Sequence, residues 1–455
     1  MTGRGGGPVP GPADPAPVRY VADAVVPCDR PGTVLRPGVV EVAGDTVTHV
    51  GRVASSTGDG PVREVRVHGV LLPGLVNVHC HSPMTLFRGS GENLPLHRWL
   101  NEVLWPQEAH LTEDDVYWGM TLAEAELLRF GVTTTCEAYF FEDALADAVV
   151  DAGARAVVTP GVLQLPGHQS GHERWWVRRT DQIADFHARR HGERGRLEVG
   201  FAPHAAYTVP LPGLVHVAEA ARELDALFHI HLAETEEECR RFAAEHGDST
   251  PAVLARAGVF DGRVLAAHSI WLSAADIDCY RRFDVAVAHC PQSNAKLASG
   301  MAPVVEFLAR GVRVGLGTDG PASNNDLDLW EEIRLAAMVA RIREQDAGAL
   351  PAAAALDLAT RGAGGALGRP DLGVLAPGGR ADMVAVRLDD PAFVPMLDDD
   401  RMIEHLVWSA SSRLITDVWV AGVPVVAAGE CLTVDVDRAC HEVETRARRL
   451  SLAVG

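Results

Sequence analysis

Eight short β-rich runs alternate with helical stretches between residues 71 and 320, and this alternation restricts the fold more than any other feature of the sequence. Consecutive runs are separated by enough residues for a crossover helix, which is the pattern of βα units in a parallel sheet. The runs are 71–81, 133–139, 155–163, 197–205, 227–235, 264–272, 285–294 and 312–320. Eight such units predict an α/β protein with a closed (β/α)8 TIM barrel.

The two ends of the chain predict a second, smaller unit. Segments 18–70 and 369–430 show strand-like alternation interrupted by Gly and Pro. Because one segment precedes the barrel and the other follows it, the simplest arrangement is a small β-sandwich domain built from both chain ends. We expect the barrel over 71–368, a C-terminal helix over 431–455 and a disordered, Gly- and Pro-rich leader over 1–17.

Charge and cysteine content narrow the class of protein. The formal net charge of -20 disfavours nucleic-acid partners, since a polyanion would be repelled. The eight cysteines form no CxxC pair, which argues against a disulfide framework and a thiolate zinc site. No apolar run is long enough for a membrane helix. These features predict a cytoplasmic protein that acts on a small molecule, without membrane or nucleic-acid partners.

Two histidines share one face of the first predicted barrel strand. His79 and His81 are two residues apart in NVHCHS, so strand alternation points both imidazoles the same way and Cys80 the other way. Converging imidazoles suit a metal ion. Taken alone, the motif is also consistent with two histidines that are packed in a core and bind no metal.

Other strand ends favour the metal. His231, His268 and Asp319 each fall near the C-terminal end of a predicted strand, where barrel enzymes place their chemistry. One divalent ion, Zn²⁺ or alternatively Fe²⁺, is expected on four ligands: His79, His81, His231 and Asp319. His268 is expected beside these ligands; alternatively His268 is itself a ligand and Asp319 mainly orients the water. His229, two residues before His231 on the same face of the strand, is interpreted as a packed core histidine, and the alternative is a further ligand.

Glu234 is the predicted proton shuttle. It follows His231 by three residues, just beyond the strand, where a carboxylate can exchange protons with an activated water and with a substrate. The alternative is a solvated charge at a helix start. The predicted catalytic residues are Glu234, His268 and Asp319.

Six motifs in order support a resemblance to a known family. These are LLPGLVNVHCHSPMTLFRG, GFAPHAAYTV, HIHLAET, AAHSIWL, HCPQSNAKLASG and GLGTDGPASNN. Together they resemble the methylthioadenosine and S-adenosylhomocysteine deaminase branch of the amidohydrolases, a group related to triazine hydrolases and to cytosine and guanine deaminases. The resemblance covers almost the whole chain and implies a barrel plus β-sandwich, the metal ligands and shuttle named above, and a homo-oligomer. The single lysine, Lys296, lies beyond the seventh run, so a lysine-bridged two-metal centre is not expected.

The same resemblance suggests the substrate contacts. Glu108 resembles the carboxylate that holds ribose hydroxyls, and His204 resembles the histidine that contacts the ring; each could instead be a structural residue. The other expected contacts are Trp105, Met84, Trp175, Arg174 and Asn294. The segment 165–179, which includes His168, is interpreted as a lid, and the alternative is that its tryptophans cover the barrel rim or an oligomer contact. Pro160 stands where members with amino-acid-bearing substrates carry an arginine, so the resemblance does not by itself imply the homocysteine-bearing substrate.

The sequence therefore favours hydrolytic deamination of an adenosine-type nucleoside to its inosine analogue and ammonia. One alternative keeps the site but changes the ring to a free heterocycle such as guanine, a pterin or a triazine. A third hypothesis is a non-catalytic scaffold, which the intact ligand set disfavours.

Overall fold

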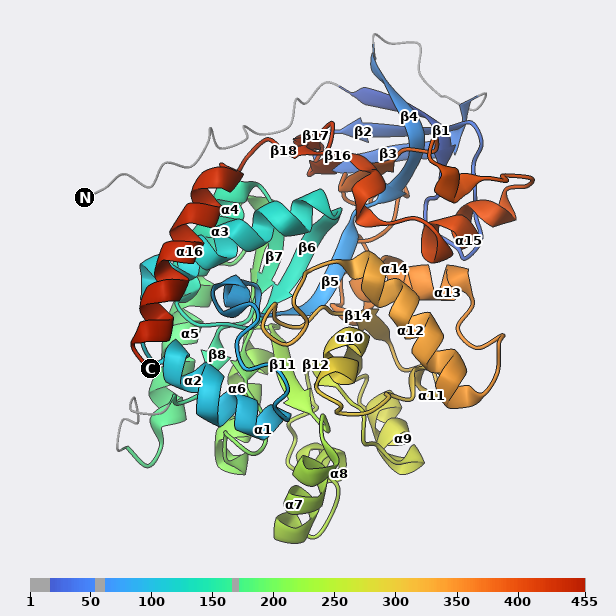
Figure 1. Ribbon diagram of the computed structural model, residues 1–455. Coiled ribbons are helices and arrows are strands. Elements are labelled where there is room, and N and C mark those ends of the chain that lie inside the picture. The colour runs from blue at the N-terminus through green and yellow to red at the C-terminus, as the bar shows by residue number, and fades with distance from the viewer. Residues whose placement is uncertain (1–16, 54–61, 166–171, 455) are drawn as a thin grey trace.

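The computed structural model describes residues 17–53, 62–165 and 172–454. Residues 1–16 of the expected leader and His168 of the expected lid lie outside these ranges. Within them, strands and helices alternate around a barrel, and a sheet built from both chain ends packs at one end of it (Figure 1). The prediction of an α/β barrel with a domain made from the two chain ends is confirmed.

The barrel wall consists of two parallel four-stranded sheets that meet along both edges. Pairing runs β5-β6-β7-β9 in one sheet and β11-β12-β13-β14 in the other. Parallel bridges between Phe201 and Phe228 and between Cys80 and Asp319 join the two sheets. Each predicted run overlaps one of these strands: β5 (Leu75–Cys80), β6 (Val132–Glu137), β7 (Arg155–Val158), β9 (Leu197–Val199), β11 (Leu227–Leu232), β12 (Arg263–His268), β13 (Ala286–His289) and β14 (Val314–Leu316).

Helices surround this wall. They are α3 (Glu113–Arg129), α4 (Glu142–Ala152), α5 (Trp175–Arg190), α6 (Leu211–Glu223), α7 (Glu236–His246), α8 (Thr250–Arg256), α9 (Ala274–Arg282), α10 (Pro291–Lys296), α11 (Val304–Ala309), α12 (Leu329–Glu344), α13 (Ala352–Asp357) and α14 (Arg361–Ala366), with a 3-10 turn at Glu193–Gly195. In α12 the Asp328 side chain caps the first turn, and Trp330, Ile333 and Ala337 are buried as the helical periodicity predicts.

Three connections, from β5 to α3, from β7 to α5 and from β9 to α6, extend the C-terminal end of the barrel. Between β5 and α3 lie the 3-10 helix Ser82–Phe87, α1 (Leu96–Trp99), the π-helical turn Leu100–Leu104 and α2 (Trp105–Glu108). The short strands β8 (Gly161–Val162) and β10 (Ala202–Pro203) pair with each other beyond β7 and β9. All three connections contribute side chains to the pocket described below.

The second domain is one eight-stranded sheet that folds back on itself. Its order is β18-β17-β16-β15-β4-β1-β2-β3, and the antiparallel pair β4·β15 joins the two chain ends. Tyr20 and Trp419 are three strands apart in this order, which would separate them by about 14 Å in a flat sheet. Their ring centroids lie 5.2 Å apart, so the sheet curls around a common core. The strands are β1 (Val18–Val25), β2 (Gly38–Ala43), β3 (Thr46–Arg52), β4 (Arg63–Pro73), β15 (Met383–Val386), β16 (Ile415–Val420), β17 (Val423–Ala427) and β18 (Glu430–Cys431).

The end of the chain returns to the barrel. The chain segment between β15 and β16 contains α15 (Asp400–Trp408) and two 3-10 turns, Pro391–Phe393 and Ser412–Leu414. After the last strand, α16 (Val436–Leu452) packs along α3 (Figure 1). Arg446 and Arg449 of α16 form ion pairs with Asp115 of α3. Among the described residues, no helix is both long enough and apolar enough to cross a membrane.

A buried ion pair connects the barrel to the second domain. Arg155 at the start of β7 donates to both carboxylate oxygens of Asp382, at 2.9 and 3.2 Å, and Asp382 also accepts from the Ala421 backbone amide. We expect Arg155→Met to lower the free energy of unfolding by about 3–5 kcal/mol, because it leaves Asp382 as an uncompensated buried charge. Urea unfolding followed by circular dichroism measures this loss. Arg98→Met, which removes an exposed arginine of a surface pair, is the control and should leave the unfolding midpoint nearly unchanged.

Candidate active site

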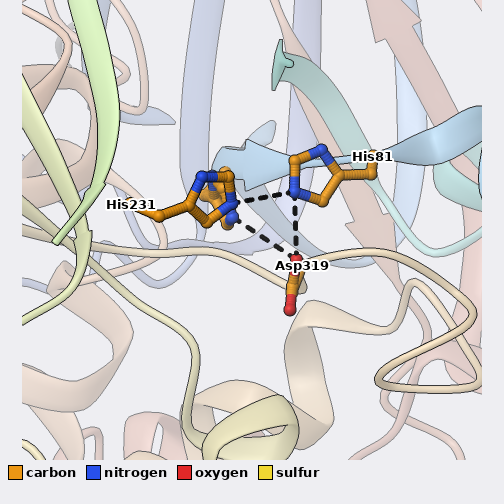
Figure 2. Close-up of side chains that lie close together, drawn as sticks. His81, His231 and Asp319 are labelled. Carbon is orange, nitrogen blue, oxygen red and sulfur yellow. Dashed lines mark hydrogen bonds and ion pairs between the residues drawn. The ribbon is translucent and has the colours of Figure 1, made fainter. Parts of the chain in front are cut away.

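Four side chains converge at the C-terminal end of the barrel. His79 lies in β5, His81 directly after it, His231 in β11, and Asp319 three residues after β14. One ligand atom from each lies within 4.8 Å of the others, which makes this group able to hold a metal ion. The Nε2 atoms of His81 and His231 are 3.1 Å apart, and Asp319 Oδ1 lies 3.3 Å from His81 Nε2 (Figure 2).

Hydrogen bonds on the far side of the rings direct lone pairs into this group. His81 Nδ1 donates to the Ala138 carbonyl at 2.5 Å, and His231 Nδ1 donates to the His204 carbonyl at 2.8 Å. A carbonyl oxygen only accepts, so the Nε2 atom of each neutral ring carries the lone pair. Ligands about 2.1 Å from one ion, at angles of about 90–110°, are separated by about 3.0–3.4 Å. The Nε2–Nε2 distance fits that range.

The charge states suit a metal as well. His79 Nε2 is buried and has no hydrogen-bond partner among the described residues, and burial lowers the pKa of His79 to about 4. Burial alone would raise the pKa of Asp319, but His79 and His81 hold it well below its usual value. Asp319 Oδ2 accepts from Ser293 Oγ at 2.6 Å and Ser323 Oγ at 2.7 Å. Neutral imidazoles and an ionised carboxylate are the forms that bind a divalent cation.

Glu234 is held by the start of α7. Thr235 and Glu238 form a capping box, and the Glu238 carboxylate also accepts the backbone N–H groups of Ala233 and Glu234, at 3.3 and 3.0 Å. Burial, and then the charge of Asp319, raises the pKa of Glu234 well above its ordinary value. A carboxyl group that keeps its proton more readily than usual is suited to exchange protons near neutral pH.

His268 faces Glu234. Its Nε2 lies 3.9 Å from Glu234 Oε2, and its Nδ1 donates to Asn294 Oδ1 at 2.8 Å. His268 stands outside the four-residue metal group that the described part of the chain contains. Ala233, His268 and Asp319 all have positive φ, at 54°, 66° and 59°. Such left-handed backbone is costly for residues other than glycine and is concentrated at functional sites.

A pocket opens beside the metal group, and the empty space between its walls, open solvent included, is about 550 Å³. Its walls are largely apolar, and its polar groups are concentrated at two positions, around the metal group and around Glu108. The residues that line it are His81, Met84, Leu96, Trp99, Leu100, Leu104, Trp105, Glu108, Ala138, Tyr139, Phe140, Leu163, His204, Tyr207, His231, Glu234, His268, Asp319 and Ser323.

Glu108 is the polar group at the second position. It is only 3% exposed and accepts one hydrogen bond, from Tyr139 Oη at 2.7 Å. Burial raises the pKa of Glu108 to about 8, and the Tyr139 bond lowers it only in part. A carboxylate offers about four acceptor positions, so Glu108 has acceptor capacity left for donors on a ligand.

The structure brings some of the predicted substrate contacts into this pocket and not others. Met84, Trp105, Glu108 and His204 line it. Asn294 lies behind His268 and orients that ring. Arg174 is exposed, and the ring centroid of Trp175 lies 6.0 Å from that of Trp176. Arg174 and Trp175 are not among the residues that line the pocket, so their contacts with substrate stay predictions.

Sequence reasoning missed part of the pocket. Tyr139 lies two residues beyond β6, so the strand-end argument that found Asp319 applied to it too. Residues 81–112, between β5 and α3, form a connection much longer than usual for a βα unit, which is typical of a functional loop. This connection supplies Leu96, Trp99, Leu100 and Leu104. Tyr207 and Leu163 carried no signal that separates them from core residues.

Comparison with known proteins agrees with this geometry. Residues 70–425 match the amidohydrolase family. The chain is 44% identical, over 84% of its length and 87% of the relative, to a 5-methylthioadenosine/S-adenosylhomocysteine deaminase from Desulforudis audaxviator. It is 39% identical to a protein of the same name from Pelotomaculum thermopropionicum, over 94% of this chain and 97% of the relative.

Solved structures are similar over nearly the whole chain. An adenosine deaminase from Xanthomonas campestris, with bound zinc, has a TM-score of 0.90 and 35% identity, and the match covers 97% of this chain and 100% of that one. An atrazine chlorohydrolase from Arthrobacter aurescens, complexed with zinc, has a TM-score of 0.85 at 24% identity, over 94% of this chain and 100% of the other. The second likeness shows the shared fold only.

Proposed function

This chain belongs to the amidohydrolase family, and we propose that it is a metal-dependent deaminase that converts an adenosine-type nucleoside to its inosine analogue and ammonia. The relatives at 44% and 39% identity, named as deaminases of adenosine derivatives, support this activity. The similar structure of an adenosine deaminase also supports it.

One observation carries the proposal: a single pocket joins the metal group to the buried carboxyl group of Glu108. Two vicinal sugar hydroxyls would satisfy the acceptors of Glu108 that Tyr139 leaves free, while a flat ring lies against His204 and Trp105 beside the metal group. A free base would leave Glu108 without these donors, and a buried polar group without partners penalises binding.

The chemistry follows from the positions of the side chains. A divalent ion held by His79, His81, His231 and Asp319 would lower the pKa of a water molecule and so supply a nucleophile near neutral pH. Glu234 takes a proton from the attacking water and gives it to the ring nitrogen next to C6. His268, oriented by Asn294, stabilises the oxygen that adds to C6. The remaining proton of that oxygen passes by way of Asp319 and His268 to the exocyclic amine, and the C6–N bond breaks, so water and the aminated ring become the oxo ring and ammonia.

The pocket favours an uncharged group on the 5′ carbon. Among the described residues that line it, none is Arg or Lys, and much of the wall is aliphatic or aromatic. By the family resemblance, Pro160 stands where members with amino-acid-bearing substrates carry an arginine. We therefore propose adenosine or a 5′-thioether of adenosine with a small apolar substituent as the preferred substrate class.

An ammonia-release assay tests the activity. Adenosine, 5′-methylthioadenosine, S-adenosylhomocysteine, guanine and cytosine are compared with one preparation in which the metal is also quantified. We expect about one ion per chain and the highest kcat/KM on the first two nucleosides. Turnover of guanine alone would replace the proposal by the free-base alternative, and a pure chain without bound metal or activity would favour the scaffold.

Substitution of Glu108 separates nucleoside from free-base chemistry. We expect Glu108→Gln to lower kcat/KM for adenosine by about 10- to 100-fold, because an N–H₂ group replaces a carboxyl oxygen that accepts a sugar hydroxyl, and one such bond is worth about 1.5–3 kcal/mol when Glu108 is ionised. Steady-state kinetics on adenosine and 2′,3′-dideoxyadenosine measures the effect, which should be small on the dideoxy substrate. Glu102→Gln, on the same connection but exposed, is the control. An unchanged kcat/KM in Glu108→Gln would remove the sugar contact.

Three finer points complete the proposal. We propose zinc as the resident ion, with iron as the alternative, and the zinc bound in the similar adenosine deaminase structure supports this choice. We also propose a homo-oligomer, supported by the family resemblance. A reducing cytoplasm is supported by the eight cysteines, all of which are free.

A further inference from the structure

His229 lies directly beneath the metal group and touches one of its members. It is in β11, two residues before His231, and is 1% exposed. Its Nε2 lies 2.8 Å from His79 Nδ1. The prediction from sequence was a packed core histidine, but a hydrogen bond to His79 goes beyond packing.

The contact continues to a second side chain and ends on the backbone. His229 Nδ1 lies 3.1 Å from Thr159 Oγ1, and Thr159 Oγ1 donates to the Glu137 carbonyl at 2.8 Å. Because the carbonyl only accepts, the single hydroxyl proton of Thr159 is used there, and Thr159 Oγ1 accepts from His229 Nδ1. His229 Nε2 is then an acceptor, and His79 Nδ1 donates to it. Cys136 Sγ, at 3.6 Å from His229 Nδ1, is a longer and weaker contact.

The Nδ1 atoms of the three histidines in the metal group therefore have two kinds of hydrogen-bond partner. His81 and His231 keep their proton on Nδ1 because each donates to a backbone carbonyl. His79 has its Nδ1 contact with a side chain instead, and this side chain could equally donate or accept. The direction of the hydrogen bond between His79 and His229 therefore depends on a further contact, and Thr159 makes that contact with His229.

We infer that Thr159 and His229 are positioning residues that fix the tautomer of His79, with the proton on Nδ1 and the lone pair of Nε2 directed into the metal group. Neither histidine changes its charge in this arrangement. His79 Nε2 points toward Asp319 Oδ1, 3.4 Å away, as a ligand atom must. Partners that orient metal-bound histidines typically contribute about 10- to 100-fold in metal affinity.

Two matched pairs of variants test the inference, which rests on the metal site of the proposed function. His229→Gln keeps an acceptor oxygen at the reach of Nε2, and His229→Met has a similar length without it. Thr159→Val removes the hydroxyl at constant shape, and Thr159→Ser keeps it. The measurement is the dissociation constant of Zn²⁺, obtained by competition with a chromophoric chelator. We expect His229→Met and Thr159→Val to weaken zinc binding by about 10- to 100-fold, and His229→Gln and Thr159→Ser to stay within about threefold of the wild type.

A spectroscopic readout separates tautomer selection from packing. In the zinc-loaded protein labelled with ¹⁵N-histidine, we expect the His79 signals of a ring protonated at Nδ1, and an altered His79 pattern in Thr159→Val. Circular dichroism checks that each variant folds; if His229→Met does not fold, the threonine pair decides.

Failure of the inference can be told from failure of the proposed function. If the wild type does not bind zinc, the proposed metal site is wrong and the inference falls with it. If the wild type binds zinc and the folded Thr159→Val and His229→Met variants bind it equally well, only the inference is overturned, and His229 is a packing residue.

Discussion

Glu234→Gln is expected to lower kcat for deamination of adenosine by about 10²- to 10⁴-fold while the bound metal stays at its wild-type level. Glu234 is buried beside His268 and is not one of the four residues of the metal group. Glutamine preserves its shape but cannot carry a proton from water to the ring. Initial rates of ammonia release, with metal content measured on the same samples, give both quantities.

The chain offers a matched control for this variant. Glu236 follows Glu234 by two residues and is exposed, so Glu236→Gln makes the same chemical change outside the pocket. Its kcat should equal that of the wild type. Full activity in Glu234→Gln would exclude Glu234 as the proton shuttle and leave His268 as the remaining candidate.

Asp319→Asn is expected to reduce kcat/KM by about 10³-fold or more, equivalent to about 4 kcal/mol of transition-state stabilisation. The carboxylate contacts His79 and His81 through Oδ1 and is held by two serine hydroxyls through Oδ2. An amide removes the negative charge that favours a cation, and its N–H₂ group cannot accept from a serine. Zinc affinity and ammonia release are measured together.

The two readouts distinguish the roles left open for Asp319. Loss of zinc together with activity identifies it as a ligand, whereas retained zinc with lost activity identifies it as the group that orients the water. Asp326→Asn, seven residues further along the same loop and outside the pocket, serves as the control. Wild-type kinetics in Asp319→Asn would contradict both roles.

The fold was predictable from the sequence because the sequence patterns that indicate its strands and helices are local. Buried parallel strands of three to six residues recur between helical segments, as in HIHL and VLAAH, and period and spacing alone identify them. Helix α12 was predictable for the same reason, since its cap at Asp328 and its buried face depend only on residues within a few turns. The curl that brings Tyr20 onto Trp419 was not, because it depends on how far the whole sheet twists.

The metal group was predictable from the sequence for a topological reason. In a closed parallel barrel every strand ends at the same rim, so a histidine or aspartate at a strand end can be placed near the others without coordinates. His79, His81, His231 and Asp319 follow this rule. Arg174 and Trp175 do not, because they lie at the start of α5 and no rule of register relates such residues to the rim.

Sequence by itself determined the chemistry of this protein: the barrel, the residue types at its rim and the place of Glu234 after β11. Only the tertiary structure decided which partner each side chain has. Tyr139 reaches Glu108 across 31 residues, Thr159 reaches His229 across 70 residues, and His229 reaches His79 across 150 residues. Periodicity reports which way a side chain faces, whereas a hydrogen bond depends on distances of a few tenths of an ångström, and these are set when the barrel closes and its core packs.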